Sequence, residues 1–171
     1  MINPAALVLT DGSIFRGESV GAEGEVIGEL VFYRNATGYQ EALIDPACAG
    51  KIVTFTTSHI GNTGINDQDN RFASIAPSAV VMRSLSLIPS HFRSRESFSD
   101  LLRRRNIIAL SGIDTRELSQ RALSAGTLLS CIITGNYSDR ELQEKAAQSF
   151  AKRESTLLTT FSNLSNHPLE A

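Results

Sequence analysis

The chain has 171 residues, 42% of them hydrophobic, and a formal net charge of −2. Its length fits one domain and excludes a repeat array or a complete β/α barrel of about 250 residues. The balanced charge excludes the basic excess typical of nucleic-acid-binding domains, so we expect no nucleic-acid partner. Its two cysteines, Cys48 and Cys131, lie far apart and form no disulfide framework, which predicts a reduced, cytoplasmic chain.

The first half of the chain predicts mainly strands. Residues 5–9 are apolar and β-like, residues 11–12 are an Asp-Gly turn, and residues 13–18 alternate apolar and polar. This pattern predicts an antiparallel hairpin at the start of the fold. Residues 26–33 predict a further strand, with a bulge at Gly28. The apolar run at 5–9 is too short for a signal peptide or a membrane span, so we expect no membrane partner.

The middle of the chain is more irregular. Residues 39–43 predict a single helical turn that Pro46 ends. Residues 51–57 are rich in β-branched side chains and predict a buried strand. Residues 58–70 are polar and contain glycines, so they predict a long loop before another strand at 79–85.

The second half of the chain alternates between helix and strand. Asp114 and Gly126 mark the two ends of one predicted helix, and Ser138 with Glu141 forms a capping box at the start of the last helix. The predicted helices cover residues 96–105, 114–125 and 139–152, and the predicted strands cover residues 107–110 and 128–134.

A β-rich beginning followed by alternating helices and strands predicts an α/β (α+β-like) fold in a single domain with antiparallel N-terminal strands. We assign residues 1–154 to this domain. Residues 155–171 are rich in Ser, Thr and Asn and predict a tail or linker.

The residues alone predict no assembled catalytic site. Cys131 lies in an apolar strand, which indicates a structural thiol. Cys48 lies in a predicted turn that would expose it, but no base stands beside it to support a cysteine hydrolase. His59, His91 and His167 lack metal-ligand spacing, so we expect no metal and no cofactor.

The glycine-bearing loop at residues 59–66 leaves two interpretations open. Its backbone amides could bind an anion, or it could be a compact structural loop. It lacks the Lys-Ser/Thr pair that completes a P-loop.

Several segments form a set with a characteristic order and spacing. Residues 32–41, followed by Asp45-Pro46, resemble the signature F-N-T-x-M-T-G-Y-Q-E…D-P. The segments Leu7-Val8-Leu9-x-Asp11-Gly12, His59-Ile60-Gly61-Asn62-x-Gly64-x-Asn66, Ser90-x-Phe92-Arg93 and Gly112-Ile113-Asp114-Thr115-Arg116 agree with it in order. Together, from about residue 5 to about residue 150, they resemble the N-terminal domain of the small subunit of glutamine-dependent carbamoyl-phosphate synthase.

The resemblance implies a swivelling β/β/α domain that performs no chemistry alone. In the family, this domain packs on the large synthase subunit and on an amidotransferase domain that hydrolyses glutamine. The ammonia travels to the large subunit, where it is joined to bicarbonate using ATP, for pyrimidine and arginine biosynthesis. We therefore expect part of a ligase, with no catalytic residue in this chain and no glutaminase machinery in residues 155–171.

The same resemblance implies which positions contact glutamine and which lie at partner interfaces. At position 47 the family has a serine that contacts bound glutamine, and this chain has Ala47. Ser58 replaces a usual proline, and Arg34-Asn35-Ala36 departs from the usual Asn-Thr-x-Met. The candidate partner-interface residues are Gly38, Tyr39, Gln40, Glu41, His59, Gly61, Asn62 and Arg116.

An alternative function stays open. A stand-alone domain of this family, recruited as a binding or regulatory module without glutaminase activity, would also explain the loss of the serine hydroxyl at Ala47.

Overall fold

Seven strands close into one sheet in the order β1-β2-β6-β5-β4-β3-β7, in a computed structural model that describes residues 3–35, 39–62, 76–86 and 96–165. The side chains of Gln40 and of residues 157–165 lie outside this description. The strands are β1 (Pro4–Leu9), β2 (Ile14–Ser19), β3 (Glu25–Tyr33), β4 (Ile52–Phe55), β5 (Ala79–Val81), β6 (Ile108–Ser111) and β7 (Leu129–Thr134).

The sheet has an antiparallel part and a parallel part. β1 pairs antiparallel with β2, which confirms the predicted hairpin, and also with β7. β3, β4, β5 and β6 run parallel to one another. Because these four strands run parallel, their carboxyl ends lie at the same end of the sheet. The mixed α/β class is confirmed, whereas the swivelling-domain type stays a prediction.

The predicted bulge at Gly28 is absent. β3 pairs with β7 without an inserted residue from Glu25↔Ile133 to Glu29↔Leu129. A Cβ at position 28 would lie 2.9 Å from Ile52 Cγ1. The glycine therefore allows β4 to pack closely against β3, and it does not interrupt the strand.

The short helices lie in the connections and after β6. They are α1 (Tyr39–Ala42), the 3-10 helix η1 (Pro46–Cys48), α2 (Phe98–Arg104) and α3 (Thr115–Ala125). Asp114 caps α3 as predicted, because its Oδ1 accepts hydrogen bonds from the backbone N–H groups of Arg116 and Glu117 at 3.1 and 3.0 Å. The predicted strand at 79–85 is shorter, and Leu85 forms only an isolated bridge with Ile60.

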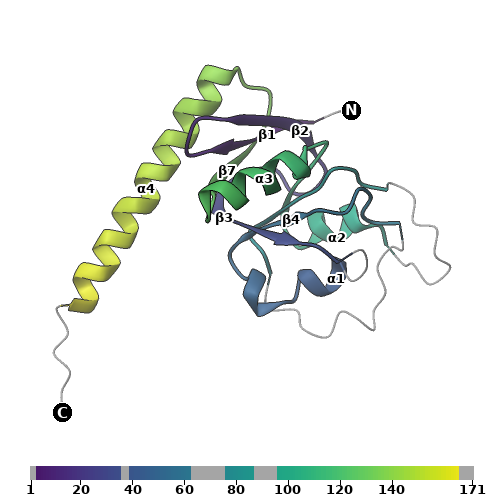
Figure 1. The fold of residues 1–171 in the computed structure, drawn as a ribbon, viewed down its shortest axis with the longest axis horizontal. Helices are drawn as coiled ribbons and strands as arrows, with labels where there is room; N and C mark the ends of the chain where they lie inside the picture. The colour runs from purple at the N-terminus through teal and green to yellow at the C-terminus, as the bar shows by residue number, and fades with distance from the viewer. Residues whose placement is uncertain (1–2, 36–38, 63–75, 87–95, 166–171) are drawn as a thin grey trace, which may run out of the picture.

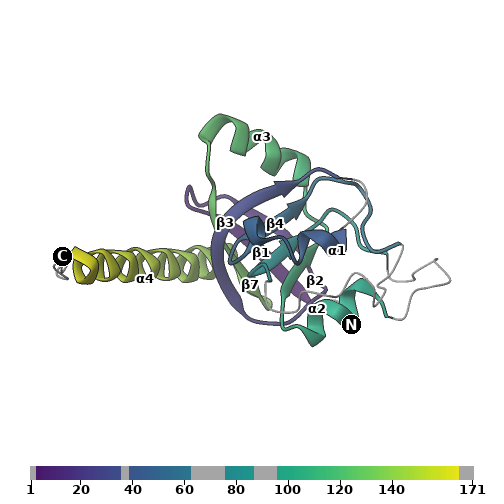
Figure 2. The same ribbon diagram turned by 90° about the horizontal axis from the view of Figure 1, so that it is seen from below.

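The last helix, α4 (Asp139–Ser165), is longer than the predicted 139–152 helix. Its extension contains no glycine or proline, and the hydroxyls of Ser155 and Thr156 donate to the Lys152 carbonyl at 2.8 and 2.9 Å. Figures 1 and 2 show α4 projecting away from the sheet, on the side opposite α1 and α2. The assignment of residues 155–171 to a segment beyond the domain stays a prediction.

Buried side chains form three clusters that follow the alternation of the strands. One fills the closed sheet, with Leu7, Ile52, Val81, Leu110 and Ile132 among its members, and includes Leu118 of α3. The second joins α1 and α2 to the outer face of the parallel strands. The third joins α4 to the outer face of β1 and β7. None of the described helices is long and apolar enough to cross a membrane.

Candidate functional site

Most of the predicted interface residues lie at the end of the sheet where the parallel strands finish. We call this region the carboxyl rim and define it as the described residues that follow β3, β4, β5 and β6: residues 34–35, 39–42, 56–62, 82–86 and 112–116. In parallel α/β sheets, the carboxyl ends of strands are the usual location of binding sites.

Tyr39 lies on the rim, but its side chain belongs to the core. It is 5% exposed, and its ring lies 4.8 Å from the ring of Phe98, centroid to centroid. Phe98 in turn lies 6.3 Å from the ring of Phe55. This aromatic row joins α1, α2 and β4. The structure therefore gives Tyr39 a packing role, and its place at a partner interface stays a prediction.

Gly61 also has a structural reason to be glycine. Its φ is +89°, and a Cβ there would lie 2.9 Å from Leu85 Cδ1 and 3.3 Å from the Ser86 carbonyl oxygen. The neighbouring Ile60 N–H donates to the Ser84 carbonyl at 3.0 Å, so it is not available to an anion. These contacts favour the structural interpretation of residues 59–62, and residues 63–66 lie outside the described part.

The remaining candidates are mostly at the surface. Glu41, His59, Asn62 and Arg116 are exposed. Gly38 lies outside the described residues, and of Gln40 only the backbone, which belongs to α1, is described.

Ala47 lies away from the rim, in η1, on the return from α1 to the beginning of β4. It is exposed, and its backbone N–H donates to Asp45 Oδ1 at 2.8 Å. The position that the resemblance associates with glutamine contact is therefore at the surface, but its side chain offers only a methyl group.

Neither cysteine is placed as a nucleophile. Cys48 is 7% exposed, so the predicted exposure of its turn is wrong, and burial raises the pKa of its thiol. Cys131 is fully buried, and burial followed by the nearby charge of Glu25 raises the pKa of its thiol to about 12. A thiol needs a lowered pKa and access to solvent to react at neutral pH. Both side chains therefore act as structural residues.

The buried Cys131 thiol predicts a loss of stability at alkaline pH. An unfolded thiol has a pKa of about 8.5, so the folded chain retains this proton to higher pH than the unfolded chain does. Its contribution is complete below about pH 8.5 and is lost as the pH rises toward about 12. We expect Cys131→Ala to remove this part of the pH dependence, so the free energies of unfolding of the two proteins should converge between about pH 8 and about pH 10. A difference that stays constant with pH would contradict the assignment.

One hollow on the rim was not predicted as a site. It has a volume of about 500 Å³, and its lining residues come from the segments after β3, β4 and β5 and from α3. They are Arg34, Thr56, Ser58, Arg83, Thr115, Arg116, Ser119 and Gln120. Sequence analysis identified Arg116 and noted Arg34 and Ser58 as departures from the family pattern, but missed Arg83. Arg83 lay inside the strand predicted at residues 79–85, and it follows the strand only because β5 ends at Val81.

The family comparison includes residues from all seven strands of the closed sheet. The family model described as carbamoyl-phosphate synthase small chain, CPSase domain, matches residues 7–132, from β1 into β7. The chain belongs to this family. The predicted resemblance to carbamoyl-phosphate synthase small chains is confirmed.

Two bacterial relatives carry the name carbamoyl phosphate synthase small chain. The protein of Vibrio parahaemolyticus is 46% identical over 146 residues, which cover 85% of this chain and 38% of the relative. That of Photorhabdus laumondii is 44% identical over 150 residues, which cover 88% of this chain and 39% of the relative. The chain thus spans about two fifths of the length of these relatives.

One solved structure shows a weak likeness to this chain. An aminopeptidase from Aneurinibacillus sp. strain AM-1 aligns with a TM-score of 0.44 and 14% identity, over 77% of this chain and 30% of the aminopeptidase. A likeness of this strength carries no argument about fold or function.

Proposed function

We propose that this chain acts as the non-catalytic N-terminal domain of a carbamoyl phosphate synthase small chain. In this role it packs on the large synthase subunit and on an amidotransferase domain, during glutamine-dependent carbamoyl phosphate synthesis in the cytoplasm for pyrimidine and arginine biosynthesis. The observation that carries the proposal is the family match over residues 7–132, together with 44–46% identity to the relatives described above.

Burial limits the chemistry of the two thiols in the described part of the chain. Both thiols are buried, and burial raises the pKa of each. Within the described ranges, no group of three or more His, Cys, Asp or Glu side chains could hold a metal ion. Neither a cysteine nucleophile nor a metal centre is therefore offered by this part of the chain.

The rim supplies a surface suited to a protein partner. Glu41, His59, Asn62 and Arg116 are exposed there, supported by the buried side chain of Tyr39. Polar and charged side chains over a packed base are typical of the outer part of protein interfaces, where charges determine which partner is accepted. We place the large-subunit contact on this surface.

Charge reversal at the rim tests the proposed interface. We expect Arg116→Glu to weaken binding of the large synthase subunit by about tenfold or more, because a like-charge contact at an interface is strongly unfavourable. The measurement is the dissociation constant of the chain and the purified large subunit by surface plasmon resonance. Arg140→Glu is the matched control, since Arg140 is 86% exposed and lies on α4, away from the rim.

The possible results separate the function from the surface. Absence of binding between the unchanged chain and the large subunit would overturn the proposed function. Equal binding by the unchanged chain and by Arg116→Glu would show that the interface does not include this part of the rim.

One observation favours a second candidate function, a binding or regulatory module without glutaminase activity. The exposed Ala47 has no hydroxyl with which to contact glutamine, and such a hydrogen bond contributes about 1 kcal/mol. This candidate expects no heat of glutamine binding to the chain in calorimetry, and detectable binding would contradict it.

A further inference from the structure

The hollow on the rim combines three arginines with several hydroxyl groups and no acidic side chain. Arg34 follows β3, Arg83 follows β5, and Arg116 lies in the first turn of α3. The hollow, at about 500 Å³, has the size of small-molecule sites. Three separate segments thus contribute one positive charge each to the same concave surface, in a chain whose net charge is −2.

These three positive charges are not neutralised within the described part of the chain. The ion pairs there engage other arginines, such as Arg16 with Asp139 and Arg121 with Glu117. None of the three guanidinium groups in the hollow forms an ion pair or hydrogen bond with a described residue. Arginine presents several N–H donors in a planar fork that matches the oxygens of phosphate and carboxylate groups.

The acidic residues near the hollow are already occupied. The Asp114 carboxylate accepts hydrogen bonds from two backbone N–H groups at the start of α3. Glu117 pairs with Arg121 at 2.8 Å, and both line a different hollow. The N–H groups of Arg116 and Glu117 in the first turn of α3 already donate to Asp114, so they are not free to bind an anion. The side chains of the hollow must therefore supply the binding.

Thr115 adds a hydroxyl group that has no partner among the described residues. Thr115 lines the hollow, and no described residue forms a hydrogen bond with its hydroxyl. Thr56 lines the same hollow, but its hydroxyl donates to the Tyr33 carbonyl at 3.2 Å, so its proton is not available to an anion. Of these two hydroxyl groups, that of Thr115 can therefore donate to an oxyanion in the hollow.

From these contacts we propose that the carboxyl rim contains a binding site for a small molecule that bears a phosphate group. Arg34, Arg83 and Arg116 hold the phosphate oxygens, and the Thr115 hydroxyl donates a further hydrogen bond. A phosphate ester carries between one and two negative charges near neutral pH, which suits three unpaired arginines better than a single carboxylate does. The site goes beyond the proposed subunit role, although it shares Arg116 with the proposed large-subunit contact, and it is formed by residues of this chain alone.

Titration of the chain alone with inorganic pyrophosphate and inorganic phosphate tests this site. The readouts are isothermal calorimetry and amide shifts in nuclear magnetic resonance, at an ionic strength of about 0.15 M so that loose surface attraction is screened. We expect pyrophosphate to bind at or below about 1 mM. The largest shifts should fall on residues 34, 56, 83, 115 and 116.

Variants assign the binding to the hollow. We expect Arg34→Gln and Arg83→Gln each to weaken pyrophosphate binding by about tenfold or more, since each removes a charged donor. Thr115→Val preserves shape and should weaken it by about threefold to tenfold. Arg140→Gln, on α4, is the matched control and should bind as the unchanged chain does. Circular dichroism and thermal unfolding confirm that each variant is folded.

Several results would overturn the proposal: no pyrophosphate binding, equal binding by the arginine variants and the unchanged chain, or shifts centred away from the hollow. Binding of a glutamate-rich peptide in place of phosphate would also overturn it and would identify the hollow as part of a protein interface. Because the large subunit is absent from this titration, a negative result leaves the proposed function untouched.

Discussion

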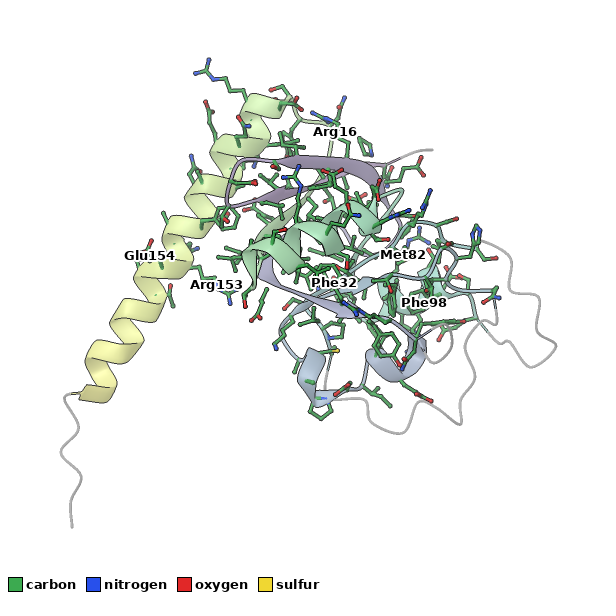
Figure 3. The ribbon with its side chains drawn as sticks, viewed as in Figure 1. Arg16, Phe32, Met82, Phe98, Arg153 and Glu154 are labelled. Atoms are coloured by element: carbon green, nitrogen blue, oxygen red, sulfur yellow. The ribbon has the colours of Figure 1, made fainter. Side chains whose placement is uncertain are left out.

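Replacing Phe98 with alanine is expected to lower the free energy of unfolding by about 3 to 5 kcal/mol. Phe98 is completely buried, and its ring packs against Tyr39 and Phe55 in edge-to-face arrangements. Figure 3 shows it with Met82 on the α2 side of the sheet. The substitution removes the side chain that joins α1 and α2 to β4, and it leaves a cavity among well-packed neighbours.

Denaturant-induced unfolding monitored by circular dichroism measures this loss. Leu123→Ala is the matched control, because Leu123 is 76% exposed on α3 and its truncation should change stability by less than about 0.5 kcal/mol. Equal stability of the two variants would show that packing of these three aromatic rings does not contribute to the stability of the fold.

Gly21→Ala is expected to lower the free energy of unfolding by about 3 kcal/mol through a backbone clash. A Cβ at Gly21 would lie 2.4 Å from the Ile107 carbonyl oxygen and 2.8 Å from Ala109 Cβ. The chain cannot move away easily, since the N–H groups of Val20 and Ala22 donate to the Ala109 and Ile107 carbonyls, each at 2.9 Å. These bonds extend the contact of β2 with β6, which completes the closed sheet.

Gly50→Ala provides the control for this prediction. Gly50 has a φ of +68° and open space around its Cβ position, in a turn closed by the hydrogen bond from the Lys51 N–H to the Cys48 carbonyl at 3.1 Å. Alanine there should cost only about 1 to 2 kcal/mol of backbone strain. Chemical denaturation of both variants measures the comparison. If Gly21→Ala were no less stable than Gly50→Ala, close approach of β2 and β6 would not be what requires glycine at position 21.

Local signals in the sequence predicted the elements well. The Asp11-Gly12 turn identified the β1–β2 hairpin, and the Asp114 cap with Gly126 bounded α3 within one residue. These features depend on neighbours a few residues apart, which the sequence displays directly.

Pairings between distant segments could not be predicted in the same way. β2 pairs with β6 through Glu18↔Ser111 and Ser19↔Leu110, although about 90 residues separate the two strands. Neither segment carries a sequence signal for pairing with the other. The closure of the sheet could therefore not be predicted from the sequence. The length of α4 was underestimated for another reason. Its Ser- and Thr-rich extension looks like a tail by composition, whereas it contains no residue that breaks a helix.

The candidate site shows the same division between local and distant signals. Motif spacing selected residues 59–62 and Arg116, and these do lie on one rim. It did not reveal that Tyr39 and Gly61 are buried. Arg83 was missed because it lies in no motif, and its importance appears only when β5 lies beside β4 and β6.

The length of α4 has a mechanical consequence. Its first half is fixed to the sheet by Leu142 and Ala146 and by the Arg153 guanidinium, which points toward the body in Figure 3 and donates to the Ile27 carbonyl at 3.1 Å. From Arg153 to Ser165 the helix continues for about 18 Å, at 1.5 Å per residue. Because the helix is stiff, a group attached at Ser165 would have a defined position relative to the sheet. A small rotation of the sheet would therefore displace that group over a larger distance.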